Sequence, residues 1–255
     1  MLFNQKRLLF LFSLFLYIEA VADDYDYIFA ADTWPPYYGP QLNKGGVLTE
    51  IIQEAYQLQD KKVFVVFTSW KRALELSKKG QYHAMFGAYP VPEREPYFQY
   101  SSVICRSRMY LFSKHTKAYT INTIEDLSKL RVGIVRGYYY SEAFEQADFL
   151  NKQEAVSDKV NIKLLIHDRI DLIVIDDRVL QHYINTTYPL FADQYRQYTP
   201  VISDDTVHLA ISKAIPNTQQ LYQEFEQGFA KMKTQGRVQA ILQAHGFAPL
   251  VKSKQ

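Results

Sequence analysis

The stretch YHAMFGAYPVPERE, residues 82–95, joins an apolar run to a polar loop that contains Arg94. The run YHAMFG (82–87) has the largely apolar character of a central strand in a parallel sheet, which is buried on both faces. Loops that follow such strands carry binding groups in α/β proteins. The stretch therefore predicts an α/β fold in which Arg94 faces a cleft.

Strand and helix patterns alternate on both sides of this stretch. Strands are predicted at 25–31, 62–67, 82–87, 109–114, 131–137, 171–176 and 208–212, and helices at 45–56, 70–79, near 140–166, from Pro216 onwards and after Gly236. Strand-helix-strand order predicts mostly parallel sheets with right-handed crossovers. Because the second half repeats the order of the first without a glycine/serine linker, we expect two compact lobes joined by strands.

The order of the elements also predicts the boundaries of the lobes. We expect lobe 1 to contain residues 23–104 and 210–255, and lobe 2 to contain residues 105–209. The chain then crosses twice between the lobes. Hinges are expected near 104–106 and 206–208.

The first 22 residues have the features of a secretory signal peptide. Lys6 and Arg7 precede the apolar run LLFLFSLFLYI (8–18), and AVA (20–22) supplies small residues for cleavage. A membrane anchor is the weaker alternative, because the apolar run is shorter than the roughly 20 residues that a span needs. We predict a mature chain that starts at Asp23 and is free in the periplasm or secreted. It is not a lipoprotein, because the only cysteine, Cys105, is far from the cleavage point.

The composition argues against several classes of protein. The formal net charge is +2 and falls to +1 without the signal peptide, which carries two cations and one carboxylate. Neither nucleic acid nor a membrane surface is therefore an expected partner. A single cysteine excludes an intrachain disulfide, and no metal-ligand pattern is present, so we expect no cofactor and a packed Cys105. We expect a monomer.

Several motifs together resemble the periplasmic solute-binding proteins for polar amino acids, the receptor components of ABC importers (family 3 extracellular solute-binding proteins). The motifs are WPPYYG (34–39), GGVLTEII (45–52), Gly-x-Tyr-x-Ala (80–84), the seven-residue spacing from Gly87 to Arg94, EDLSKLRVGIVRGYYY (125–140) and RIDLIVIDD (169–177). The resemblance spans nearly the whole mature chain. It implies a two-lobed binding-protein fold, each lobe a mostly parallel sheet flanked by helices, with two hinge strands.

The resemblance also implies the polar contacts of a ligand. The arginine of the "PER" motif, Arg94, is expected to bind an α-carboxylate, and Asp176, five residues after Asp171, an α-ammonium. A guanidinium suits a carboxylate because it offers two parallel charge-assisted hydrogen bonds. Asp176 follows an apolar strand at the carboxyl edge of a sheet, where ligands bind. The residues themselves leave open whether Asp176 or Asp177 faces the cleft, because one of them can cap the next helix.

Aromatic and glycine residues complete the expected site. The predicted aromatic walls are Trp34, Trp70, Tyr89 and Tyr138, which offer apolar and cation-binding surfaces. Gly87 opens the loop that carries Arg94. The turn Arg136-Gly137 is expected to present N–H groups to an anion. Arg72 is either a second anion contact or a solvated charge.

The expected function is capture of an amino acid or related small carboxylate by hinge closure, followed by delivery to an ABC transporter permease, without catalysis. One alternative is a periplasmic sensor subunit for a membrane signalling protein. Another is an enzyme, because cyclohexadienyl dehydratase uses the same fold; no catalytic set beyond Asp176 points to it. The sequence does not fix the ligand.

Overall fold

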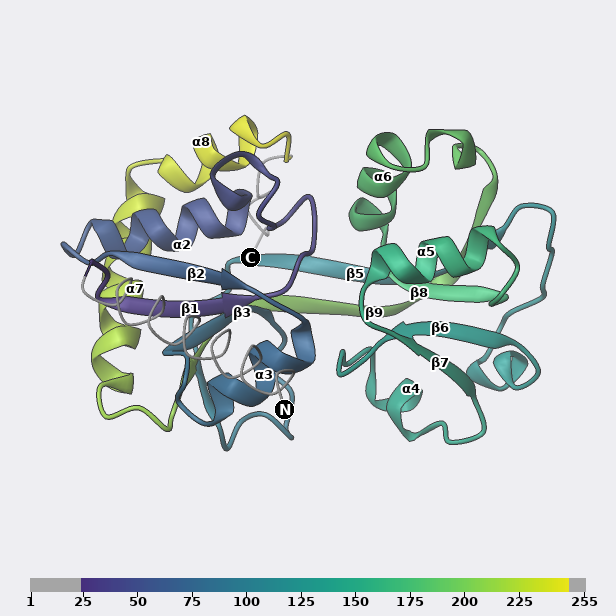
Figure 1. The fold of residues 1–255 in the computed structure, drawn as a ribbon, viewed down its shortest axis with the longest axis horizontal. Helices are drawn as coiled ribbons and strands as arrows, with labels where there is room; N and C mark the ends of the chain where they lie inside the picture. Colours follow the sequence, from purple (N-terminus) through teal and green to yellow (C-terminus); the bar gives the residue numbers. More distant parts are fainter. Residues whose placement is uncertain (1–23, 248–255) are drawn as a thin grey trace, which may run out of the picture.

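The structure, a computed structural model, describes residues 24–247. Figure 1 shows two α/β lobes joined by two long strands, β5 (Cys105–Lys114) and β9 (Tyr195–Ser212). One continuous sheet runs through both lobes in the order β2-β1-β3-β9-β5-β8-β6-β7, and β4 pairs with β9. The predicted two-lobed α/β fold is confirmed. The predicted signal peptide lies outside the described residues.

The first lobe has helices on both faces of its sheet. Its elements are β1 (Tyr27–Ala31), η1 (Asn43–Gly45), α2 (Val47–Gln57), β2 (Val63–Phe67), α3 (Trp70–Lys78), β3 (Ala84–Ala88), β4 (Phe98–Tyr100), α7 (Thr218–Thr234) and α8 (Arg237–Ala244). β1 pairs in parallel with β2 and β3. Side chains alternate along β1: Phe29 and Ala31 join the core packed by α2 and α7, whereas Ala30 joins the core packed by α3. Burial on both faces explains why β1 is apolar throughout.

The second lobe repeats this arrangement. Its elements are η2 (Ile124–Leu127), β6 (Arg131–Val135), α4 (Glu142–Gln146), β7 (Asn151–Ala155), α5 (Asp158–Ile166), β8 (Leu172–Asp176), α6 (Asp177–Thr186) and η3 (Pro189–Phe191). β6 is parallel to β7 and β8, and β5 is antiparallel to β8. A capping box of Thr123 and Asp126 begins η2. No helix described within residues 24–247 is long and apolar enough to span a membrane.

Two sequence predictions are wrong in this lobe. Residues 140–166 do not form one helix, because β7 lies between α4 and α5. β7 has the sequence NKQEA and is an edge strand with mostly exposed side chains, so it lacks the apolar pattern of a buried strand. β9 begins at Tyr195, well before the predicted start at His208, because its first part runs beside β5 as a polar ribbon.

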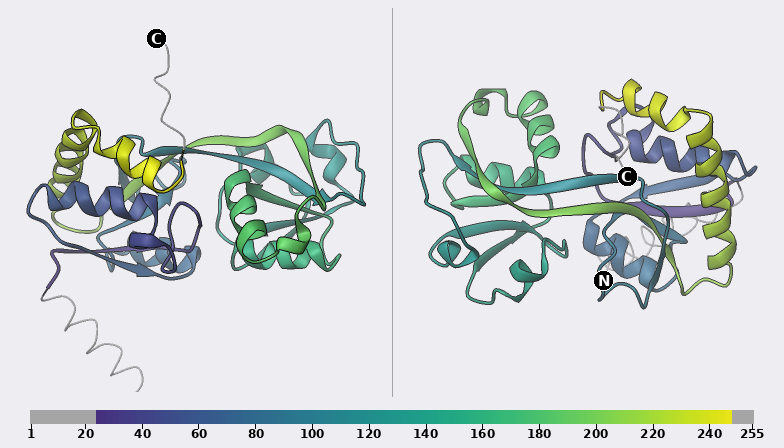
Figure 2. Two further views of the ribbon diagram at one scale, coloured as in Figure 1. Left: turned by 90° about the horizontal axis from the view of Figure 1, so that it is seen from above. Right: turned by 180° about the vertical axis from the view of Figure 1, so that it is seen from behind.

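The crossing between the lobes lies where β9 changes its partner strand. Val207 pairs with Cys105 of β5, and the next residue, His208, pairs with Ala88 of β3. Figure 2 shows β5 and β9 crossing side by side in both views. This change of partner falls within the segments predicted as hinges.

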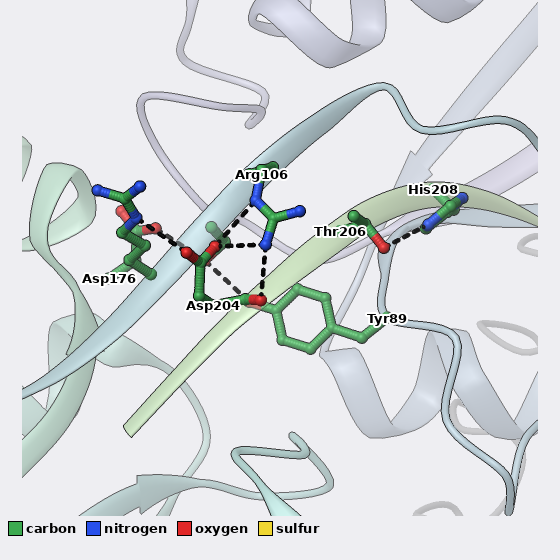
Figure 3. Close-up of polar contacts among 8 residues, drawn as sticks. Tyr89, Arg106, Asp176, Asp204, Thr206 and His208 are labelled. Atoms are coloured by element: carbon green, nitrogen blue, oxygen red, sulfur yellow. Dashed lines mark hydrogen bonds and ion pairs between the residues drawn. The ribbon is translucent and has the colours of Figure 1, made fainter. Parts of the chain in front are cut away.

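Polar side chains make hydrogen bonds along the crossing strands. Figure 3 shows Arg106 of β5 beside Asp204 of β9, with Nε 2.9 Å from Oδ1. His208 Nε2 lies 2.8 Å from Thr206 Oγ1, and its Nδ1 lies 2.6 Å from the carbonyl oxygen of Ser101. Arg106 and Asp204 thus tie the two strands to each other, whereas His208 contacts a residue of its own strand and the segment before β5.

Candidate functional site

A small cavity lies between the two lobes. It is lined by Trp34, Tyr38, Trp70, Gly87, Tyr89 and Arg94 of the first lobe and by Tyr138 and Tyr139 of the second. Its volume is about 20 Å³, which is room for about one water molecule. The lobes are therefore closed on each other, and a solute of amino-acid size requires them to separate.

Arg94 brings a buried positive charge to this cavity. It lies in the loop after β3, where its N–H donates to the carbonyl of Val91 in a turn, and the residue is 7% exposed. Its Nη2 donates to the carbonyl oxygen of Gly137 at 3.1 Å. No carboxylate among residues 24–247 forms an ion pair with it. Burial lowers the pKa of Arg94 from its usual value, so a carboxylate would stabilise the charge.

The carbonyl of Gly137 joins the second lobe to two side chains of the first. It accepts hydrogen bonds from Arg94 Nη2 and from Trp70 Nε1, the latter at 2.8 Å. The Arg94 guanidinium carbon lies 5.5 Å from the centre of the Trp70 ring, a cation–π distance. Gly137 has a φ of 80°, which favours glycine. The turn expected to present N–H groups to an anion thus presents a carbonyl oxygen to the first lobe.

Asp32 is a buried carboxylate beside the cavity that the sequence analysis did not select. It is 6% exposed and follows directly after β1. Its Oδ1 accepts from the Tyr38 hydroxyl at 3.0 Å and its Oδ2 from the Tyr138 hydroxyl at 2.7 Å. Burial raises the pKa of Asp32 to about 6, although both hydroxyls lower it in part. The Tyr138 bond crosses between the lobes.

Gly87 makes room for this hydrogen-bond cluster. Its φ is 81°, and a Cβ atom there would lie 2.0 Å from the hydroxyl oxygen of Tyr38. A side chain at this position would therefore displace the hydroxyl that binds Asp32. Gly87 lines the cavity, and this close approach gives it a positioning role in the closed structure.

Asp176 accepts four hydrogen bonds in the closed structure. It is 1% exposed and caps α6, where its Oδ1 accepts from the N–H groups of Arg178 and Val179 at 2.9 and 3.2 Å. Its Oδ2 accepts from the hydroxyls of Ser107 and Tyr37 at 2.8 and 3.1 Å. Burial raises its pKa to about 6. Asp176 does not line the cavity, so a ligand ammonium group would have to displace one of these donors.

Of the adjacent pair of aspartates, the first is the cap. Asp176 is buried, whereas Asp177 is half-buried and accepts only from the N–H of Arg178 among the described residues. The sequence left open which of the two aspartates faces the cleft. In the structure the side chain of Asp176 is directed toward the junction of the lobes, where it accepts from Tyr37.

Trp34 and Tyr89 form part of the cavity wall. Trp34 is 2% exposed and stacks on Tyr37 with ring centres 4.2 Å apart. Its indole Nε1 is buried and has no hydrogen-bond partner among the described residues, a state that costs free energy unless an acceptor arrives. Tyr89 donates to Ser107 at 2.9 Å, and Ser107 donates to Asp176. Figure 3 shows Tyr89 beside the hinge strands.

Arg136 lies outside the cavity, in an outer groove between the lobes. This groove is lined by Ser69, Trp70, Lys71, Arg72, Glu75, Leu76, Arg136 and Val156. Arg136 Nε is 2.8 Å from Glu154 in an exposed ion pair. Arg72 is exposed. Both cations are therefore solvated at the mouth of the cleft, and only Trp70 lines both the groove and the cavity.

The sequence analysis missed Tyr38 and Tyr139, which line the same cavity, and Asp32, which accepts hydrogen bonds from Tyr38 and Tyr138 of the lining. Asp32 stands at the carboxyl end of β1, the position that marks binding groups in parallel sheets, so a signal for it was present. Tyr38 and Tyr139 lack such a signal because they belong to runs of adjacent tyrosines. Within residues 24–247 no group of three or more His, Cys, Asp or Glu side chains is placed to hold a metal ion.

Comparison with known proteins places this arrangement in a family. Residues 28–247 match the model of the bacterial extracellular solute-binding proteins, family 3. No curated protein matches the sequence. Among solved structures, a mutant of ArgBP from T. maritima superposes with a TM-score of 0.74 at 13% identity, covering 86% of this chain and 93% of that chain.

Two further structures share the fold. The amino acid ABC transporter substrate-binding protein AbpA from Streptococcus pneumoniae, bound to L-arginine, has a TM-score of 0.72 at 15% identity and covers 89% of this chain and 97% of its own. A histidine kinase sensor domain with similarity to periplasmic binding proteins has a TM-score of 0.75 at 16% identity, with 87% and 96% covered. At these identities the structures establish the fold, and the family match is independent of them. The chain belongs to the bacterial extracellular solute-binding proteins of family 3.

Proposed function

We propose that this protein is a periplasmic receptor that captures a small solute with a carboxylate group, an amino acid or a related acid, in the cleft between its lobes. It then delivers the solute, without chemical conversion, to the permease of an ABC importer. The observation that carries the proposal is the buried guanidinium of Arg94, which has only the neutral carbonyl of Gly137 as an acceptor among the described residues. The family and its amino-acid-binding neighbours support the same solute class.

The proposed mechanism is hinge closure. Arg94, Trp34 and Trp70 belong to the first lobe, whereas Tyr138 and Tyr139 belong to the second, so a ligand between them contacts both lobes. Such a ligand binds the closed form better than the open form and shifts the population toward it. The strands β5 and β9 carry the rotation, because they are the connections that cross between the lobes.

A carboxylate has a physical reason to replace the Gly137 carbonyl. The carbonyl is neutral and accepts a single bond from Arg94, whereas a carboxylate offers charge and two parallel acceptors. A solute of about ten heavy atoms at roughly 0.3 to 1.5 kcal/mol each reaches micromolar affinity or better. That range suits a receptor for scarce solutes.

A thermal-shift screen of the purified protein tests the binding proposal. The panel contains α-amino acids, ω-amino acids, simple organic acids, polyamines and prephenate. A ligand at 100 times its dissociation constant adds about 2.7 kcal/mol to the stability, so a true ligand gives a clear shift. The proposal requires a shift with at least one carboxylate, and shifts with polyamines alone would contradict it.

Transport, sensing and turnover need separate experiments. A strain that lacks the protein should lose uptake of the identified solute, whereas a sensor subunit would instead alter gene expression with uptake unchanged. Recovery of the bound solute in unaltered form after prolonged incubation checks the absence of turnover, and conversion of prephenate would contradict it.

A further inference from the structure

The dipeptide Gly137-Tyr138 of the second lobe makes three hydrogen bonds to side chains of the first lobe. The Gly137 carbonyl oxygen accepts from Arg94 Nη2 at 3.1 Å and from Trp70 Nε1 at 2.8 Å. The Tyr138 hydroxyl donates to Asp32 Oδ2 at 2.7 Å. One short segment of the second lobe thus satisfies a cation, an indole N–H and a carboxylate of the first lobe.

The same dipeptide also packs against the first lobe. The ring of Tyr138 meets the ring of Trp70 edge to face, with centroids 5.4 Å apart. Gly137 lies against the start of α3, because a Cβ atom there would be 3.6 Å from Trp70 Cδ1 and 3.8 Å from Lys71 Cβ. The turn is therefore fitted to the first lobe by van der Waals contact as well as by hydrogen bonds.

These contacts take the place next to Arg94 that a solute would need. Arg94, Trp70 and Tyr138 all line the cavity, whose volume is only about 20 Å³. The Gly137 carbonyl is the acceptor that a carboxylate would replace. A solute at Arg94 and the dipeptide at Arg94 are therefore alternatives.

A second hydrogen bond between the lobes does not compete with a solute in this way. Tyr37 of the first lobe donates to Asp176 of the second at 3.1 Å, and neither residue lines the cavity. This bond can form when the lobes close with or without a solute between them. The two contacts between the lobes therefore differ in what they do to binding.

We infer that Gly137-Tyr138 is an internal latch, which holds the lobes closed over the cavity and has to be displaced from Arg94 by the solute. This inference rests on the proposed function, because it takes the cavity as the solute site and Arg94 as the carboxylate contact. The latched form is closed but cannot accept a solute. Its population lowers the apparent affinity, which is reduced by the fraction of molecules that can bind.

The two tryptophans allow the latch to be tested without any solute. Trp34 and Trp70 are the only tryptophans of the chain and are 2% and 4% exposed at the junction of the lobes. Tyr138→Phe keeps the ring and removes the hydrogen bond to Asp32. The ratio of open to closed molecules should rise about tenfold, because a hydrogen bond to a charged group is lost. Acrylamide quenching of the fluorescence and the radius of gyration from small-angle X-ray scattering should both increase.

Tyr139→Phe is the matched control. Tyr139 is the next residue and also lines the cavity, but its hydroxyl has no hydrogen-bond partner within residues 24–247. Without solute this variant should give the quenching and the radius of the wild type. The latch is overturned if Tyr138→Phe equals the wild type in both measurements, or if Tyr139→Phe opens the lobes as much as Tyr138→Phe does.

Binding measurements test whether the solute displaces the latch. Fluorescence titration is carried out with each amino acid and organic acid of the thermal-shift panel. Any acid that binds should bind Tyr138→Phe more tightly than the wild type, by up to about tenfold, because more molecules can accept it. Tyr37→Phe should show no such gain, since its bond forms in either closed form. Weaker binding by Tyr138→Phe would overturn displacement.

The outcomes separate the latch from the proposed function. If Tyr138→Phe opens the lobes but no carboxylate of the panel binds, the latch stands and the receptor proposal fails. If a carboxylate binds through Arg94 while Tyr138→Phe is as closed as the wild type and binds with the same affinity, the receptor proposal stands and the latch fails.

Discussion

Tyr37 of the first lobe donates a hydrogen bond of 3.1 Å to Asp176 of the second, across the junction between them. The same carboxylate caps α6 and accepts from Ser107 on the crossing strand β5. One side chain therefore connects a first-lobe loop, a hinge strand and a second-lobe helix. Asp176 holds the closed structure together whether or not a ligand also reaches it.

This role predicts a large loss of stability for Asp176→Ala. Loss of the helix cap alone costs about 1 kcal/mol, and the hydroxyls of Tyr37 and Ser107 lose a charged acceptor. The free energy of unfolding, measured in urea, should fall by about 2 kcal/mol or more. Asp177→Ala is the matched control, because Asp177 is half-buried and accepts only one backbone hydrogen bond; equal losses in the two variants would contradict the assignment.

The pKa of Asp32 predicts how pH affects stability. Its folded value of about 6 lies above the ordinary 3.8, so the folded state takes up this proton more readily than the unfolded state. The contribution of Asp32 to the free energy of unfolding is therefore most favourable at low pH and is lost as pH rises through about 6.

A comparison of variants isolates this effect from the other buried groups. Burial raises the pKa of Asp158 and Asp176 and lowers that of His83 and His208, so the wild-type profile combines opposing trends. Asp32→Asn should gain stability relative to the wild type between pH 5 and pH 7.5, on the order of 1–3 kcal/mol. A stability difference that stays constant over this range would exclude a raised pKa at Asp32.

Close packing at Gly87 predicts that Gly87→Ala is destabilising. The new Cβ would meet the Tyr38 hydroxyl at 2.0 Å, on a backbone with φ of 81°, so both strain and the loss of the bond to Asp32 contribute. Gly236 also has a positive φ, of 70°, but nothing lies within 4 Å of a Cβ there. The loss of stability in thermal unfolding should be clearly larger for Gly87→Ala than for Gly236→Ala. The Gly236→Ala variant measures the backbone strain alone, which is about 1 kcal/mol.

The exposed ion pairs of the hinge predict a small, salt-dependent effect. The side chains of Arg106 and Asp204 are 55% and 33% exposed, and pairs of this kind contribute about 0 to 1 kcal/mol. Asp204→Asn should change the free energy of unfolding by less than about 1 kcal/mol, and the difference should shrink at high salt. A loss of several kcal/mol in the free energy of unfolding that persists at high salt would contradict the description of this pair as a weak surface ion pair.

Much of the fold was predictable because buried strands have a distinctive composition. The strand Leu172–Asp176 is buried at every position, and the strand Val63–Phe67 is also apolar throughout although it lies at the edge of the sheet and is mostly half-buried. β7 was not predictable in this way, because an edge strand such as NKQEA exposes most of its side chains. The early part of β9 was missed for a related reason: its pairing with β5 forms a two-stranded ribbon with exposed charges.

The candidate site was predictable where the type of a residue and its place after a strand indicate a single role. An arginine in a loop after a buried strand indicated a cleft, and Arg94 lies there. Asp32 and Asp176 both end strands, and the sequence does not say which carboxylate is occupied by helix capping and hydroxyl donors and which lies beside the cavity. That distinction depends on contacts between residues far apart in the chain, such as Tyr138 with Asp32.

The central claim is that Arg94 holds the carboxylate of the solute, and calorimetric titration of Arg94→Gln tests it most directly. Arg136→Gln is the control, because Arg136 is an exposed arginine in the outer groove. With the acid that gives the largest thermal shift, Arg94→Gln should weaken binding about 100-fold, since removal of one partner of a buried charge pair costs 2–5 kcal/mol, while Arg136→Gln should bind as the wild type does. Unchanged affinity in Arg94→Gln would contradict the account.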